Sequence, residues 1–107
     1  MKRLCALLAT SLPLALWAAG EPEFSISIEN HRFTPDRLEI PAGKKVKVTV
    51  ENKDATPEEF ESNPLKIEKV IPGKSKGIVY IGPLKPGEYP FVGEYNEKTA
   101  KGVVVAK

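Results

Sequence analysis

Cysteine, methionine and histidine are almost absent from this sequence of 107 residues. Cys5 and Met1 are the single residues of their types, both at the N-terminus, and His31 is the single histidine. One cysteine cannot close a disulfide within the chain. With one histidine, no cysteine nucleophile beyond position 5 and no glycine-rich phosphate loop, the common catalytic arrangements are missing. The sequence therefore predicts a protein that is not an enzyme.

Long hydrophobic runs are also missing, apart from one at the N-terminus. Two basic residues precede an apolar run over residues 4–17, and small residues follow at 18–20. This is the three-part pattern of a secretory signal. The run is interrupted by Pro13 and is shorter than the roughly 20 residues of a spanning helix. We expect residues 1–20 to be a cleaved signal peptide and residues 21–107 to be one mature domain without a membrane span; the alternative is an uncleaved N-terminal anchor.

An excess of charge of either sign is absent from the expected mature chain. The full sequence has 16 Lys and Arg against 14 Asp and Glu, and loss of Lys2 and Arg3 leaves 14 of each sign. No basic cluster with interleaved aromatic residues is present, so nucleic acid is not an expected partner. A secreted domain of this size without disulfides depends on its apolar core for stability.

Short alternating segments make up the rest of the chain. Apolar and polar residues alternate over 24–29 and 45–51, with the period of two that is typical of half-buried strands. Further short strands are predicted at 37–40, 66–71, 77–81, 88–92 and 102–106. Proline and glycine turns separate these segments, and none has a helical apolar stripe. The pattern predicts an all-β Greek-key sandwich of seven to eight strands.

One turn carries a specific prediction. Pro86 and Gly87 are followed by Tyr89, an order that resembles the tyrosine corner of Greek-key proteins, in which the phenol donates a hydrogen bond to nearby backbone. We expect Tyr89 to have this architectural role.

The order of the motifs resembles small periplasmic cupredoxin domains. Phe33-Thr34-Pro35 and residues 38–43 are similar to the opening of such domains, and residues 86–91 with 102–105 are similar to their last hairpin. The resemblance covers nearly all of residues 21–107. It implies a cupredoxin-like β-sandwich located in the periplasm.

The resemblance also implies where a copper ion would be held. A type 1 copper site uses one thiolate, two imidazoles and a weak axial ligand that is usually methionine. The corresponding positions are Glu58 and Asn96 for the two histidines, Gly93 for the cysteine and Ala100 for the methionine. None has the required side chain, and residues 21–107 contain no Cys or Met. We therefore expect no type 1 copper and no blue-copper electron transfer.

Carboxylates are concentrated near these positions instead. The candidate metal ligands are Glu58, Glu59, Glu61, Glu68 and Glu94, with His31 and Asn96 as weaker candidates. Oxygen ligands favour ferrous or ferric iron, manganese or calcium over cuprous copper. Two other interpretations stay open. Glu59 and Glu61 could be ordinary solvated surface, and Glu58 and Glu94 could be structural, for example by capping loop amides or pairing with Lys69.

A second resemblance concerns function. Residues 56–62, with 68–71 and 81–84, are similar to cupredoxin-like proteins related to the EfeO cupredoxin domain, which are associated with bacterial iron permeases of the Ftr type. This implies a periplasmic role in the acquisition of iron or another metal ion, by carboxylate binding or by delivery to an iron permease. The alternative is a metal-free protein-interaction module on the same scaffold.

Overall fold

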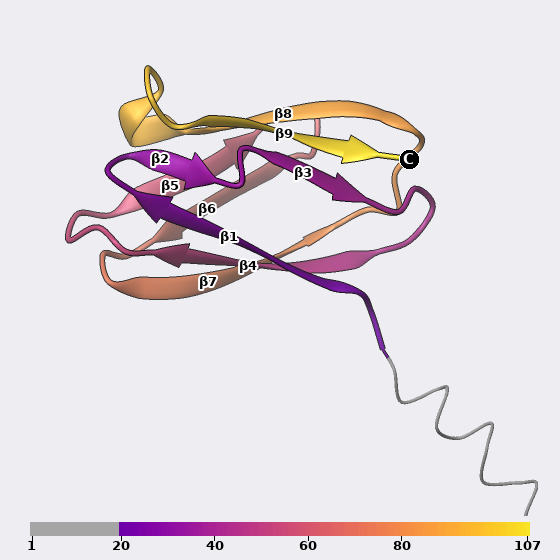
Figure 1. Ribbon diagram of the computed structural model, residues 1–107, viewed down its shortest axis with the longest axis horizontal. Helices are drawn as coiled ribbons and strands as arrows, with labels where there is room; N and C mark the ends of the chain where they lie inside the picture. The colour runs from indigo at the N-terminus through magenta and orange to yellow at the C-terminus, as the bar shows by residue number, and fades with distance from the viewer. Residues whose placement is uncertain (1–19) are drawn as a thin grey trace, which may run out of the picture.

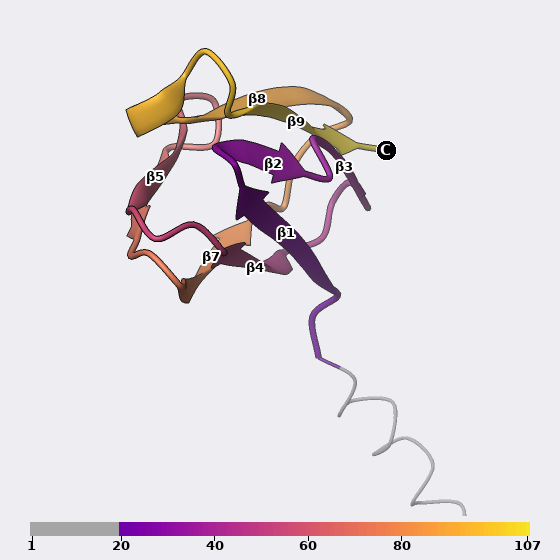
Figure 2. The ribbon, with the colours of Figure 1, turned by 60° about the vertical axis from the view of Figure 1, so that its left-hand side comes forward.

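The computed structural model describes residues 20–107 and shows two β-sheets packed face to face (Figures 1 and 2). The first sheet has the order β2-β1-β4-β7 and the second the order β3-β9-β8-β5-β6. The strands are β1 (Glu23–Glu29), β2 (Arg32–Thr34), β3 (Arg37–Ile40), β4 (Val46–Asn52), β5 (Glu58–Ser62), β6 (Ile67–Ile71), β7 (Ser75–Ile81), β8 (Gly87–Gly93) and β9 (Lys101–Ala106). The predicted all-β sandwich is confirmed, with nine strands instead of seven to eight. Residues 1–19 of the predicted signal peptide lie outside the described residues.

Strand β4 has the alternation of buried and outer-face residues that the sequence pattern predicted. Val46, Val48 and Val50 are fully buried between the sheets, while the residues between them lie on the outer face. β4 pairs in parallel with β1 and antiparallel with β7, so its apolar face extends across the first sheet. Burial of apolar side chains at about 25 cal/mol per Å² is the main stabilising contribution in such a core.

The sequence analysis assigned no strand to β2 or β5. β2 pairs with β1 through a two-residue turn at Asn30 and His31, whose φ angles of 54° and 56° belong to a type I′ turn. Glycine is the usual second residue of such a turn, and its absence at position 31 concealed the hairpin. In β5 the alternation is concealed because a charged residue, Glu58, lies on the buried face.

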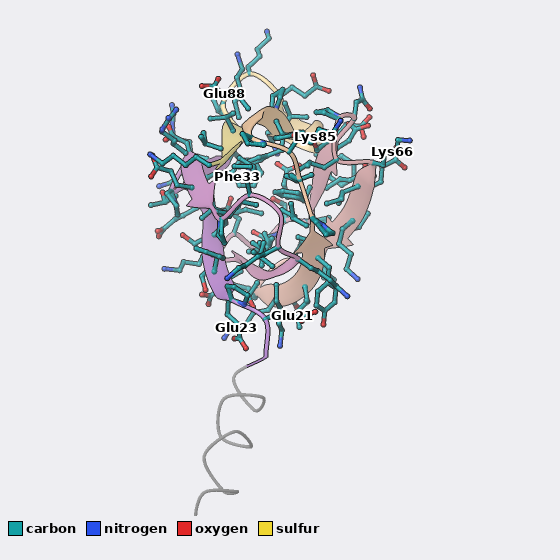
Figure 3. The ribbon with its side chains drawn as sticks, turned by 90° about the vertical axis from the view of Figure 1, so that its right-hand side faces the viewer. Glu21, Glu23, Phe33, Lys66, Lys85 and Glu88 are labelled. Atoms are coloured by element: carbon teal, nitrogen blue, oxygen red, sulfur yellow. The ribbon has the colours of Figure 1, made fainter. Side chains whose placement is uncertain are left out.

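Three phenylalanines form the aromatic part of the core. Phe60 and Phe91 stack with ring centroids 4.8 Å apart, and the Phe33 ring packs edge-on against both. Gly102 is small because the Phe91 ring occupies the space where a side chain would begin. Figure 3 shows charged side chains such as Glu21 and Lys66 around the outside of this core. The rings lie directly beneath the start of β5 and the end of β8.

The predicted tyrosine corner is confirmed, because the Tyr89 hydroxyl donates a hydrogen bond to the Lys85 carbonyl at 2.7 Å. Within residues 20–107, no helix has the length and apolar character needed to cross a membrane.

Candidate functional site

The predicted site residues lie at one end of the sandwich. Figure 1 shows the short 3-10 helix η1 (Glu94–Asn96) and the loops that follow β1, β4 and β6 at the same, left-hand end. β5 starts at this end and β8 finishes there, and Phe60 lies opposite Gly93 in the paired strands. This register brings the start of β5 beside η1.

Glu58 is the buried carboxylate of this end. Only 2% of its surface is exposed. Its Oε1 accepts hydrogen bonds from the backbone N–H of Glu59 and of Tyr95, both at 2.9 Å, and its Oε2 accepts one from Asn96 Nδ2 at 2.8 Å. A buried carboxylate is tolerated because such charge-assisted hydrogen bonds replace its hydration. The predicted structural alternative for Glu58, in which it caps loop amides, is therefore observed.

The four positions that resemble copper-ligand positions converge around this carboxylate. A Cβ atom added at Gly93 would lie 2.6 Å from Glu58 Cδ and 2.7 Å from the Ala100 Cβ. Backbone hydrogen bonds join Gly93 to Ala100 and Ala100 to Asn96. These side chains offer no thiolate, imidazole or thioether, and three donors already surround the one carboxylate. The residues present do not fit a type 1 copper ion.

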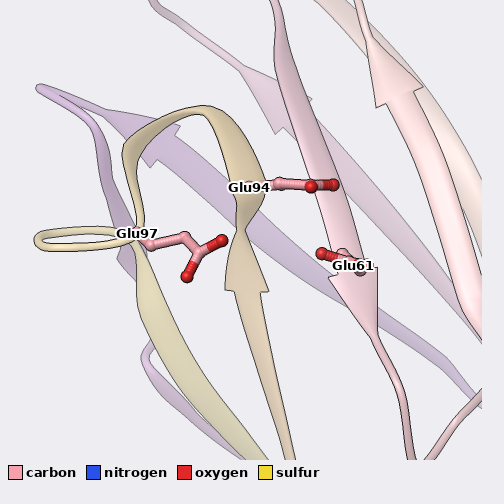
Figure 4. Close-up of side chains that lie close together, drawn as sticks. All are labelled: Glu61, Glu94 and Glu97. Carbon is pink, nitrogen blue, oxygen red and sulfur yellow. The ribbon is translucent and has the colours of Figure 1, made fainter.

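A second group of carboxylates lies on the opposite face of β5. Glu59 and Glu61 alternate with the buried residues of the strand and point outward. Carboxylate oxygens of Glu61, Glu94 and Glu97 come within 4.8 Å of one another (Figure 4). The sequence analysis missed Glu97. Its position three residues after Glu94 was the available signal, because side chains at i and i+3 align in a 3-10 turn.

Two carboxyl groups of this surface have raised pKa values. Hydrogen bonding with Glu94 raises the pKa of Glu59 to about 7, and burial and the charges of Glu94, Glu68 and Glu61 act in the same direction. Burial, followed by the charge of Glu94, raises the pKa of Glu61. Among residues 20–107, no Lys, Arg or His forms an ion pair with any of these glutamates or with Glu97. The outward carboxylates thus form an acidic surface without a direct ion pair.

The remaining predicted residues have separate surroundings. Glu68 lies on β6 directly opposite Glu61, so it borders the acidic surface. His31 is in the β1–β2 turn, where its Nδ1 lies 3.5 Å from Asp54 Oδ2. Asn96 bonds to Glu58 and not to the outward group. The structure thus divides the seven candidates among an inner pair, an outward group and His31, and their metal-binding role stays a prediction.

Comparison with known proteins identifies the fold. A family model described as "Cupredoxin-like domain" matches residues 3–106. An uncharacterized protein of Rickettsia prowazekii is 39% identical over 84 residues, which span 78% of this chain and 66%, just under two thirds, of that protein.

Among solved structures, a purple cupredoxin from Nitrosopumilus maritimus is similar with a TM-score of 0.61 and 20% identity, over 78% of this chain and 98% of that one. Auracyanin A, a blue copper protein from Chloroflexus aurantiacus, matches with a TM-score of 0.66 and 15% identity, over 82% of this chain and all of that one. These identities establish the shared fold alone.

Proposed function

Because this chain belongs to the cupredoxin-like domain family, we propose that it is a periplasmic, non-enzymatic protein that binds a hard cation and is not a blue-copper electron carrier. The observation that carries the proposal is the outward group of Glu59, Glu61, Glu94 and Glu97, which forms no ion pair with a basic side chain among residues 20–107. A cation would neutralise the carboxylate charges that, after the hydrogen bond with Glu94 and burial, contribute to the raised pKa of Glu59. Carboxylate oxygens are suitable ligands for iron, manganese or calcium.

The proposed biological role is the acquisition of iron. It is supported by the similarity of residues 56–62 to EfeO-related cupredoxin domains, and the proposed recipient of the ion is an iron permease of the Ftr type. Export by a cleaved signal peptide, residues 1–20, belongs to the same proposal. Glu68 at the margin of the acidic surface is a further proposed ligand. Glu58 is left out of the proposed ligand set, because its oxygens already accept three hydrogen bonds.

Calorimetric titration of the metal-free protein tests cation binding. We expect saturable binding of ferrous, ferric or manganous ion, and no blue colour with cupric ion. Glu94→Gln, at the centre of the outward group, should weaken binding at least about tenfold, equivalent to about 1.4 kcal/mol. Glu88→Gln is the matched control, because Glu88 is an exposed carboxylate on β8 far from this end. Absence of saturable binding by all these ions would refute the proposal.

The second candidate is a metal-free interaction module, favoured by the exposed aromatic residue beside the acidic surface. Tyr95 is 52% exposed, although its backbone N–H is held by Glu58. An exposed aromatic side chain next to Glu94 and Glu97 in the sequence is suited to contact a basic protein surface. In this case Tyr95→Ala would abolish co-purification with a membrane permease, whereas chelation of metal ions would not affect it.

A further inference from the structure

Three hydrogen-bond donors converge on one point in the interior of the site. They are the backbone N–H groups of Glu59 and Tyr95 and the Asn96 side-chain amide, and all three lie 2.8–2.9 Å from oxygens of Glu58. They come from two elements, since Glu59 belongs to β5 and the other two belong to η1. Convergent N–H groups form a concavity of positive potential, which binds anions.

The sign of this potential distinguishes the pocket from a metal site. A cation at the point where Glu58 lies would face the positive ends of three N–H dipoles and would leave all three donors without an acceptor. Buried donors without partners cost free energy. A carboxylate in the same place satisfies all of them and has the complementary charge. The interior of this end is therefore built for an anion.

The neighbouring residues give the carboxylate its space. Any side chain at Gly93 would begin 2.7 Å from Glu58 Oε2, and Ala100 is fully buried on the other side of that same position. Small residues at these two places leave a cavity that the Glu58 carboxylate fills. Glycine at 93 is therefore explained by the size of the carboxylate.

We propose that Glu58 is a positioning residue that takes over the structural task of a metal ion, acting as an internal anionic ligand that ties β5 to η1 and to the loop that continues to Ala100. The conformation of this loop then depends on Glu58 and is independent of any bound metal. This inference holds whether or not the outward carboxylates bind a cation.

Formate is the probe for the test, because it reproduces the carboxylate that Glu58→Ala removes. The hydrogen bond from the Tyr95 backbone N–H to Glu58 is monitored by hydrogen exchange of the Tyr95 amide. The exchange is measured by NMR in the chelator-treated protein. We expect exchange in E58A at least about tenfold faster than in the wild type, with protection restored by formate and not by chloride. Bound formate at ten times its dissociation constant should raise the folded-to-unfolded ratio about tenfold. Glu88→Ala is the matched control, because Glu88 is an exposed carboxylate at the far end of β8, and it should leave Tyr95 protection unchanged.

Several outcomes would overturn the proposal. They are wild-type protection of Tyr95 in E58A, no response of E58A to formate, or loss of protection when chelator is added to the wild type. If E58A does not fold, Glu58→Gln decides the question. The side-chain oxygen of the introduced glutamine still accepts hydrogen bonds from both backbone N–H groups. Its NH₂ group can donate to the Asn96 side-chain oxygen once the Asn96 amide has rotated. E58Q that folds with Tyr95 protected, but less than in the wild type, supports the proposal. E58Q with wild-type protection, or as unfolded as E58A, contradicts it.

Discussion

The two faces of β5 carry the same residue type in opposite environments. Glu58 faces inward, where three donors satisfy its carboxylate, while Glu59 and Glu61 face outward among other carboxylates. Successive side chains of a strand point to opposite faces of the sheet, so Glu58 and Glu59 are separated although they are adjacent in the sequence. Glu58, Glu59 and Glu61 therefore do not share one role. The role of each depends on the face of β5 on which it lies.

The largest expected effect is on stability and compares these neighbours directly. Glu58→Ala should lower the free energy of unfolding by about 3 kcal/mol, because it leaves buried donors without an acceptor. Glu59→Ala should not lower it, because the substitution removes an outward carboxylate that lies among other carboxylates. Urea unfolding followed by circular dichroism measures both. Equal effects of the two substitutions would invalidate the distinction between the faces.

The next effect concerns the fit between Glu58 and Gly93. Gly93→Ala places a methyl group 2.6 Å from Glu58 Cδ and should destabilise the fold by about 2 kcal/mol. In combination with Glu58→Ala the loss should be smaller than the sum of the single losses by about 1 kcal/mol, because the clash is removed. The cycle with Glu59→Ala is the control and should be additive. Additivity in both cycles would show that Gly93 and Glu58 do not share this space.

A third carboxylate at the same end should show an intermediate effect. Asp54 accepts hydrogen bonds from the backbone N–H groups of Asn30 and His31 at 2.8 and 3.0 Å, at the surface. Asp54→Asn should cost about 1 kcal/mol, and exposed Asp36→Asn should cost nothing measurable. The hydrogen bond from His31 contributes most to lowering the pKa of Asp54 below its usual 3.8. The stabilisation by Asp54 is therefore present above pH 3.8 and is lost as the pH falls through the lowered pKa.

The smallest effect is the pH dependence caused by the outward face. The pKa of Glu59 is about 7 in the folded chain against 4.5 for the ordinary side chain, so the folded state binds this proton more tightly. Stability should increase as the pH is lowered from 8 towards 5, and the gain should be complete below about pH 4.5. Glu94→Gln removes the main cause and should raise the melting temperature at pH 8 while flattening the profile. A profile that Glu94→Gln leaves unchanged would show that this repulsion is absent.

Much of the fold followed from local pattern. Apolar alternation and proline–glycine turns predicted the sandwich, and Pro86-Gly87 with Tyr89 predicted the tyrosine corner. β2 was missed because its turn places Asn30 and His31 at positive φ without the usual glycine. Glu97 was missed because its proximity to Glu61 arises from the packing of η1 against β5, and the local pattern gives only its spacing of three residues from Glu94.

The sequence by itself determined which chemistry is available: no thiolate or thioether in residues 21–107, one imidazole and many carboxylates. It also determined the strand pattern, because alternation is a property of neighbouring residues. Only the tertiary structure decided which carboxylate is buried between the sheets, namely that of Glu58. Glu58 meets the amides of η1, 37 residues further along the chain at Tyr95, through the pairing of β5 with β8. Such long-range convergence depends on strand register, and register is set by the packing of the whole sandwich.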